Sequence, residues 1–120
     1  AAFRLIETEI LEEYGKMTNQ VISTGGGIVT EKRNHLLLHQ AGYVVWLKAS
    51  PETIFDRVRR NKNRPLLQVD DPLQTIKQML EDRTEFYDAV DDLSINTDKL
   101  TLEEIKFGIV ESARVSLKLT

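Results

Sequence analysis

The sequence predicts an α/β protein in three layers (α/β/α), with helices covering both faces of a parallel sheet. Two observations carry this prediction. Three short runs rich in apolar or β-branched residues, at 21–24, 43–47 and 93–96, are typical of strands. Segments with helical periodicity precede, separate and follow these runs, so helices and strands alternate along the chain.

The first expected elements are a helix and a strand that ends in a glycine cluster. Phe3, Ile6 and Ile10 recur at steps of three and four, which predicts a helix already under way near the first residue. The β-branched run at 21–24 stops at the glycines of positions 25–27. We therefore expect a strand that ends at this cluster.

A second helix and a buried strand follow. The helix is expected at about residues 31–40, with the leucines at 36–38 facing inward and Gly42 as its C-terminal stop. The run at 43–47 is almost continuously apolar. Such a run is typical of a strand that is covered on both faces.

Cap signals predict where the remaining helices begin. Ser50 and Asp71 are N-cap residues, and each is followed directly by a proline, which favours the first helical position. Thr101 and Glu104 have the spacing of a capping box, which predicts a last helix after the strand at 93–96.

The composition is that of one soluble globular domain, spanning residues 1–120. The 16 Lys and Arg against 19 Asp and Glu give a net charge of −3, which argues against general nucleic-acid or anionic-membrane binding. The absence of cysteine excludes disulfides, thiolate metal sites and a cysteine nucleophile. No apolar run approaches the roughly 18–20 residues of a membrane span. We expect a cytoplasmic protein with neither a membrane nor a nucleic acid as partner.

The glycine cluster and an arginine-rich stretch are candidate ligand-binding features. Gly25, Gly26 and Gly27 directly follow a predicted strand, so their backbone N–H groups can approach a ligand closely. The alternative for this cluster is a flexible turn between a strand and a helix. The arginine-rich stretch at 57–64 is either a solvated helix end or a mobile lid over a phosphorylated ligand.

Two isolated arginines and a pair of histidines can each be explained without a ligand or a metal ion. Arg4 and Arg83 stand near helix ends, where each could pair with a nearby carboxylate, such as Glu7 for Arg4. His35 and His39 have the spacing of a metal-binding pair, but we interpret them as a polar helix face and predict no metal site. A P-loop of the form G-x-x-x-x-G-K-[ST] is absent from the sequence.

Four motifs together resemble those of shikimate kinases in their order and spacing, and the likeness covers essentially the whole chain. The resemblance implies a P-loop α/β fold of the nucleoside-monophosphate-kinase type. It also implies transfer of the ATP γ-phosphoryl group to the 3-hydroxyl of shikimate with Mg²⁺, a step of aromatic amino-acid biosynthesis. The motifs are Phe3-Arg4-x-x-Glu7, Ser23-Thr24-Gly25-Gly26-Gly27, Arg64-Pro65-Leu66-Leu67 and Arg83-x-x-x-Tyr87.

The resemblance implies which residues would bind shikimate. Arg4 and Arg83 would hold the shikimate carboxylate, because a planar guanidinium pairs bidentately with a carboxylate. Gly25, Gly26 and Gly27 would line the shikimate pocket, with backbone N–H groups near the transferring phosphate.

The resemblance also implies a nucleotide side. Arg64, in a lid at about residues 59–71, would close over the ATP phosphates and act in catalysis by stabilising charge during transfer. Arg57 would lie near the nucleotide, and the segment 97–101 would bracket the adenine. ATP and Mg²⁺ are therefore expected as co-substrate and cofactor.

The sequence departs from the family pattern before Arg4. The family has a strand, a P-loop with its helix and an Asp-x-Asp segment there, and this sequence shows none of them. The phosphate-binding lysine, the main Mg²⁺ ligands and the aspartate that positions the attacking hydroxyl belong to that part. We therefore expect a partial domain that supplies the shikimate-binding half and lid, and that is inactive alone.

The absent strand is central in the family's sheet, between the strands matched here by 21–24 and 43–47. Without it we expect either exchange of elements with another copy or closure of the two orphaned strands on each other. The alternative function is a non-catalytic, kinase-like binding or regulatory protein without a P-loop. A gluconate kinase is a third interpretation, against which the paired arginines and the Arg-Pro-Leu-Leu motif speak.

Overall fold

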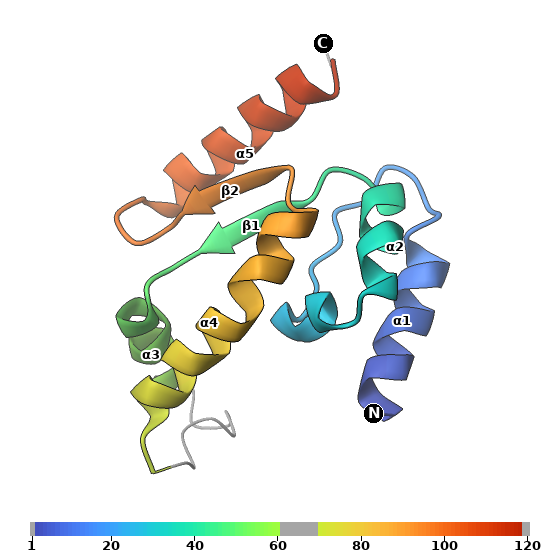
Figure 1. The fold of residues 1–120 in the computed structure, drawn as a ribbon. Helices are drawn as coiled ribbons and strands as arrows, with labels where there is room; N and C mark the ends of the chain where they lie inside the picture. Colours follow the sequence, from blue (N-terminus) through green and yellow to red (C-terminus); the bar gives the residue numbers. More distant parts are fainter. Residues whose placement is uncertain (1, 61–69, 119–120) are drawn as a thin grey trace.

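The computed structural model describes residues 2–60 and 70–118 (Figure 1). Helices and two short parallel strands alternate, which confirms the α/β class. The elements in chain order are α1 (Ala2–Tyr14), the 3-10 helix η1 (Gly26–Thr30), α2 (Arg33–Ala41), β1 (Val45–Lys48), α3 (Pro51–Arg59), α4 (Pro72–Val90), β2 (Leu93–Asn96) and α5 (Leu102–Ser116).

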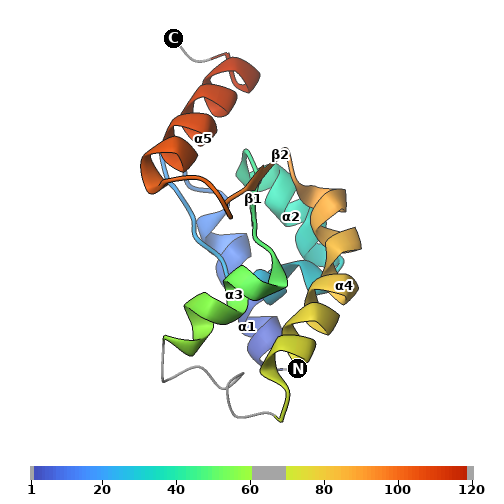
Figure 2. The same ribbon diagram turned by 90° about the vertical axis from the view of Figure 1, so that its left-hand side faces the viewer.

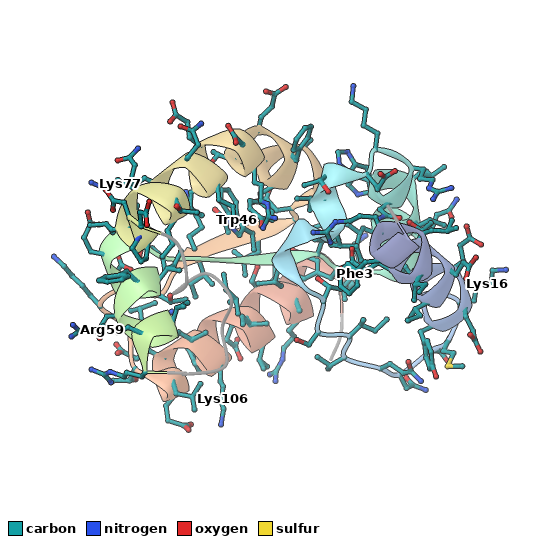
Figure 3. All side chains as sticks on the ribbon, turned by 90° about the horizontal axis from the view of Figure 1, so that it is seen from below. Phe3, Lys16, Trp46, Arg59, Lys77 and Lys106 are labelled. Carbon is teal, nitrogen blue, oxygen red and sulfur yellow. The ribbon has the colours of Figure 1, made fainter. Side chains whose placement is uncertain are left out.

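The sheet pairs β1 with β2 in parallel, and helices lie on both of its sides. The register places Val45 opposite Leu93. The strands run between α4 and α5 (Figures 2 and 3). Trp46 of β1 stacks on Tyr87 of α4 with ring centroids 4.9 Å apart, so the sheet packs against α4 through aromatic rings.

The prediction of a strand at 21–24 is wrong. These residues form a loop before η1, and the side chain of Val21 is fully exposed. Among the described residues, β1 has a hydrogen-bonded neighbour on one edge only. A β-branched run becomes a strand when a neighbouring strand takes up its backbone hydrogen bonds, and the described part of the chain places none beside 21–24.

Several apolar side chains that the pattern predicts to be buried are exposed. The strand expected at 43–47 begins at Val45, and Leu47 is 56% exposed, so cover on both faces is wrong. Leu36 also faces solvent, although Leu38 is buried as expected. The sheet of the described residues has two strands where the pattern predicts three, so less of Leu47 is covered than expected.

The first helix forms as predicted, but its apolar stripe points outward. Phe3, Ile6 and Ile10 are at least half exposed, whereas Thr8 and Leu11 are buried on the opposite face. The face of α1 that packs on the rest of the described chain is therefore partly polar.

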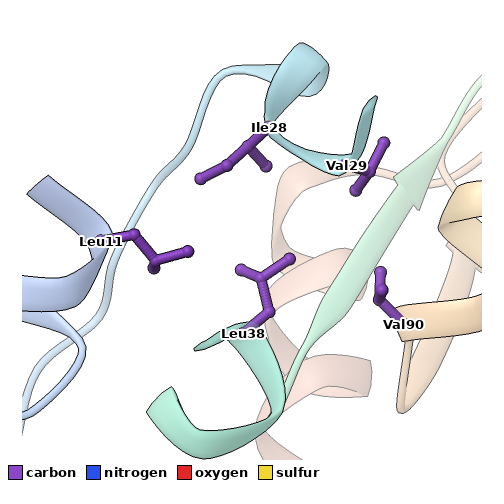
Figure 4. Close-up of a cluster of buried hydrophobic side chains, with 5 residues drawn as sticks. All are labelled: Leu11, Ile28, Val29, Leu38 and Val90. Atoms are coloured by element: carbon purple, nitrogen blue, oxygen red, sulfur yellow. The ribbon is translucent and has the colours of Figure 1, made fainter. Parts of the chain in front are cut away.

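The core joins the first half of the chain to the end of α4 (Figure 4). Leu11 of α1, Ile28 and Val29 of η1, Leu38 of α2 and Val90 of α4 form one buried cluster. Because two of these residues belong to η1, the core fixes the turn that directly follows the glycine cluster.

The predicted caps are confirmed in detail. Ser50 Oγ accepts from the Thr53 backbone N–H at 3.2 Å, and Asp71 Oδ1 caps α4 in the same manner at 3.1 Å. Thr101 and Glu104 form both hydrogen bonds of a capping box at the start of α5. These helix starts depend on residues three positions apart, which is why sequence alone predicts them.

Candidate functional site

The glycine cluster lies where α1, α2 and α4 converge. η1 begins at Gly26 and sits between α4 on one side and α1 and α2 on the other (Figure 1). Gly27 is buried, and the backbone around the cluster is not left-handed, since Gly42 is the one described glycine with a positive φ. The cluster is therefore required for the space it leaves and not for unusual backbone angles.

Arg4 extends from the first turn of α1 and occupies the space in front of Gly27. A Cβ atom placed on Gly27 would lie 2.5 Å from Arg4 Cζ, so a side chain at position 27 would displace the guanidinium. Glu7, one turn later, forms an ion pair with Arg4 Nη1. The two side chains are 30% and 14% exposed, and the carboxylate holds the guanidinium beside the glycine.

Arg83 and Tyr87 approach the neighbouring glycine from α4. A Cβ on Gly26 would lie 3.6 Å from Arg83 Nη1 and 2.9 Å from Tyr87 Oη. Tyr87 Oη also donates a hydrogen bond to Gly26 O at 2.8 Å. Two guanidinium groups from two different helices therefore flank two consecutive glycines.

The charges of this arrangement suit a small anion. Glu7 neutralises one guanidinium, whereas no carboxylate of the described residues lies within 4.0 Å of Arg83. The group of Arg4, Glu7 and Arg83 thus carries a net charge of +1. Guanidinium groups present their N–H donors in a plane that matches a carboxylate or a phosphate.

A groove of about 620 Å³ runs along α4 and meets this site at Arg83. Its walls include Thr30 at the end of η1 and Met79, Arg83 and Phe86 on α4. A space of this order accommodates a small-molecule ligand beside Arg83.

Two parts of the nucleotide side that the resemblance implies, Arg57 and the 97–101 segment, meet at the carboxyl ends of β1 and β2. Arg57 Nη1 donates to Thr97 Oγ1 at 3.4 Å, and Thr97 Oγ1 in turn donates to Lys48 O at 2.8 Å. Arg57 therefore lies beside the start of the 97–101 segment. Arg64 and residues 61–69 of the predicted lid lie outside the described residues.

Asp98 fixes this end of the sheet to the start of α3. Its Oδ1 accepts from the Ser50 backbone N–H at 2.9 Å. This hydrogen bond, assisted by Thr53, Ser50 and the charge of Arg57, lowers the pKa of Asp98 below its ordinary value.

The interpretation of both histidines as a polar helix face is wrong for one of them. His39 is exposed, but His35 Nε2 bonds to Val29 O at 2.7 Å and its ring lies 5.9 Å from that of Phe86.

Within the described ranges, no group of three or more His, Cys, Asp or Glu side chains could hold a metal ion. None of the described helices is long and apolar enough to cross a membrane.

The structure adds two residues to the predicted site. Glu7 and Tyr87 belong to the motifs that carry the resemblance, but they were not among the predicted site residues. Each lies one helical turn from a predicted arginine, since Glu7 follows Arg4 by three residues and Tyr87 follows Arg83 by four. That spacing places each pair on one helix face and is the signal that identifies them.

Comparisons with known proteins point in one direction. The family model for shikimate kinase matches residues 1–114. Shikimate kinases from Legionella pneumophila (strain Corby) and Thermodesulfovibrio yellowstonii are 37% and 39% identical to this chain over 109 residues, or 91% of it. A solved shikimate kinase from Acinetobacter baumannii in complex with shikimate superposes with a TM-score of 0.87 at 36% identity, over 98% of this chain. The chain spans 62% of the two bacterial relatives and 65% of the solved one.

Proposed function

Since this chain belongs to the shikimate kinase family, we propose that it supplies the shikimate-binding half of an enzyme that phosphorylates the 3-hydroxyl of shikimate with ATP. The observation that carries the proposal is the placement of Arg4 and Arg83, from two helices, against consecutive glycines. The matched proteins are shikimate kinases, so they favour this activity and give no support to a non-catalytic or gluconate-kinase alternative.

In this proposal the two arginines bind the shikimate carboxylate. Each guanidinium donates N–H groups to the carboxylate, and together they fix the orientation of the ring. Glu7 keeps Arg4 in place, and Gly26 and Gly27 leave room for the guanidinium groups and the ligand. The solved relative with shikimate bound supports a ligand of this class.

The nucleotide side is proposed on the resemblance and on the position of Arg57. Arg57 and the 97–101 segment would contact the nucleotide, and Arg64 would close over the phosphates. Mg²⁺, when bound, would neutralise developing phosphate charge. No group of three or more His, Cys, Asp or Glu side chains that could hold a metal ion is present among the described residues, and the proposal assigns no Mg²⁺ ligand to them. No step of the proposal on this chain depends on the metal.

A further strand beside β1 is part of the proposal. The support is physical: β1 has a bare edge among the described strands, Leu47 and Val21 are exposed, and 21–24 has the composition of a strand without a partner. A parallel strand from the P-loop region, or from a second copy, would pair with both β1 and residues 21–24.

The location proposed for the enzyme is the cytoplasm.

Titration of the chain with shikimate, followed by two-dimensional amide NMR, tests the proposal. We expect saturable shifts at residues 25–30, their loss in Arg83→Ala, and wild-type behaviour in the control Arg33→Ala. Arg33 is a suitable control because it is an exposed arginine of α2 that pairs with Glu31. A folded chain whose spectrum ignores shikimate would contradict the proposal. An undispersed spectrum would show that the added strand is needed to build the site.

A further inference from the structure

Side chains donate hydrogen bonds to the backbone carbonyls of four successive residues of η1, 26–29. Three of the donors come from α2 and α4, and one comes from the turn itself. Such a run of side-chain donors fixes the orientation of each peptide group in turn. The four hydrogen bonds are Tyr87 Oη to Gly26 O at 2.8 Å, Thr30 Oγ1 to Gly27 O at 2.7 Å, Asn34 Nδ2 to Ile28 O at 2.9 Å and His35 Nε2 to Val29 O at 2.7 Å.

Two of these donors are consecutive residues at the start of α2. Asn34 is completely buried, and His35 is half-buried with its ring tilted against Phe86. Because a backbone carbonyl only accepts, the Nε2 atom of His35 carries the proton in its bond to Val29 O. The α2 helix is therefore bound to η1 by side-chain hydrogen bonds as well as by apolar packing in the core.

The buried side chain of Asn34 has one polar atom with a hydrogen-bond partner and one without. Its Oδ1 atom is buried without a hydrogen-bond partner among the described residues. Burying an unpaired polar atom is unfavourable, so the unpaired Oδ1 atom offsets part of the stability that the hydrogen bond to Ile28 O contributes. What Asn34 does supply is one donor aimed at Ile28 O.

We infer that His35 and Asn34 are positioning residues of the arginine–glycine pocket. They hold the carbonyls of residues 28 and 29 toward α2, which keeps Gly27 against the Arg4 guanidinium. Neither residue is part of the predicted site, and within the described part of the chain neither forms a hydrogen bond or an ion pair with Arg4 or Arg83. The ligand consequence of this inference rests on the proposed function, whereas its effect on the turn does not.

The position of Arg4 makes the pocket sensitive to this turn. The guanidinium and the Gly27 backbone are in direct contact, so a shift of a few tenths of an ångström in η1 moves or crowds the ion pair with Glu7. Losing the His35 donor leaves Val29 O unpaired in a part-buried place, and the peptide group then turns toward water.

Three variants separate positioning from general stability. His35→Phe keeps an aromatic ring beside Phe86 and removes the N–H donor. His35→Gln places an amide N–H near the original Nε2 position and keeps the donor. His39→Phe is the matched control, because His39 is an exposed histidine of the same helix.

Native-state amide hydrogen exchange without ligand and the shikimate dissociation constant are measured on all four proteins. We expect His35→Phe to raise exchange at residues 25–30 about fivefold more than in the rest of the core, and to weaken shikimate binding about fivefold. His35→Gln restores both values, and His39→Phe matches wild type.

Two results would overturn the positioning role. One is exchange at residues 25–30 that is no faster in His35→Phe than in His39→Phe. The other is exchange that rises equally over the whole core, with no rescue in His35→Gln, which would make His35 merely structural. A wild-type chain that does not bind shikimate would refute the proposed function, and the exchange comparison would still decide the positioning role.

Discussion

Substituting Gly27 by alanine perturbs the contact on which the candidate site depends. The new Cβ would lie 2.5 Å from Arg4 Cζ. Carbon atoms in ordinary contact are about 3.5–4.0 Å apart, so the guanidinium must retreat by about 1 Å. A hydrogen bond stretched by about 1 Å is outside the normal range, so Arg4 loses its charge-assisted bonds to a bound carboxylate.

The expected loss follows from the value of such bonds. Hydrogen bonds to charged groups contribute about 1.5–3 kcal/mol, which corresponds to a shikimate dissociation constant raised about 10- to 150-fold. The fold should change little, because the Gly27 backbone is not left-handed and the displaced group is the end of a flexible side chain. Isothermal titration with shikimate and urea unfolding measure the two quantities separately.

The neighbouring glycines provide a graded control series. At Gly25 the nearest atom to a new Cβ is Glu7 Oε2 at 3.4 Å, an ordinary contact, so Gly25→Ala should bind shikimate nearly as wild type does. At Gly26 the contact with Tyr87 Oη is 2.9 Å, and an intermediate effect is expected. Equal affinities for all three variants, or the largest loss at Gly25, would refute the reasoning from space around Arg4.

Three further predictions concern hydrogen bonds at the site and at the helix starts. Tyr87→Phe removes the donor to Gly26 O and should destabilise the chain by about 1 kcal/mol in urea unfolding, with weaker shikimate binding. Thr101→Ala removes one half of the α5 capping box and should lower the unfolding free energy by about 1 kcal/mol without changing shikimate affinity. The Ser50 N–H lowers the pKa of Asp98, so its stabilising contribution is present at neutral pH and is lost as the pH falls through that lowered pKa. Urea midpoints measured from neutral to acidic pH should therefore fall less steeply in Asp98→Asn than in wild type.

The parts of the fold that depend on near neighbours could be predicted from the sequence. The caps at Ser50, Asp71 and Thr101 each need a donor or acceptor three residues away, and the structure confirms all of them. Gly42 ends α2 as expected, with a φ of 151° that favours glycine.

The parts that depend on distant segments could not be predicted in this way. The run at 21–24 has the composition of a strand, but a strand needs a partner, and the described residues provide none. The apolar stripe that begins with Phe3 is exposed for the same reason, since burial depends on what packs against it. The hydrogen bond from His35 to Val29 O joins a helix to the preceding turn, and no periodicity signals such a bond.

The candidate site lies between these two cases. Propensity and spacing alone leave Arg4 and Arg83 as isolated arginines, 79 positions apart (83 − 4) in the sequence. The resemblance of the motifs places both at one ligand, and the structure brings both guanidinium groups to consecutive glycines. Their role in binding a carboxylate stays a prediction.

Comparing shikimate with its methyl ester by isothermal titration tests the central claim most directly. The ester keeps the ring and the hydroxyls but removes the negative charge that Arg4 and Arg83 are proposed to bind. The account predicts that the ester binds at least about tenfold more weakly than shikimate, since charge-assisted hydrogen bonds are lost. Equal affinities for the acid and the ester would contradict it.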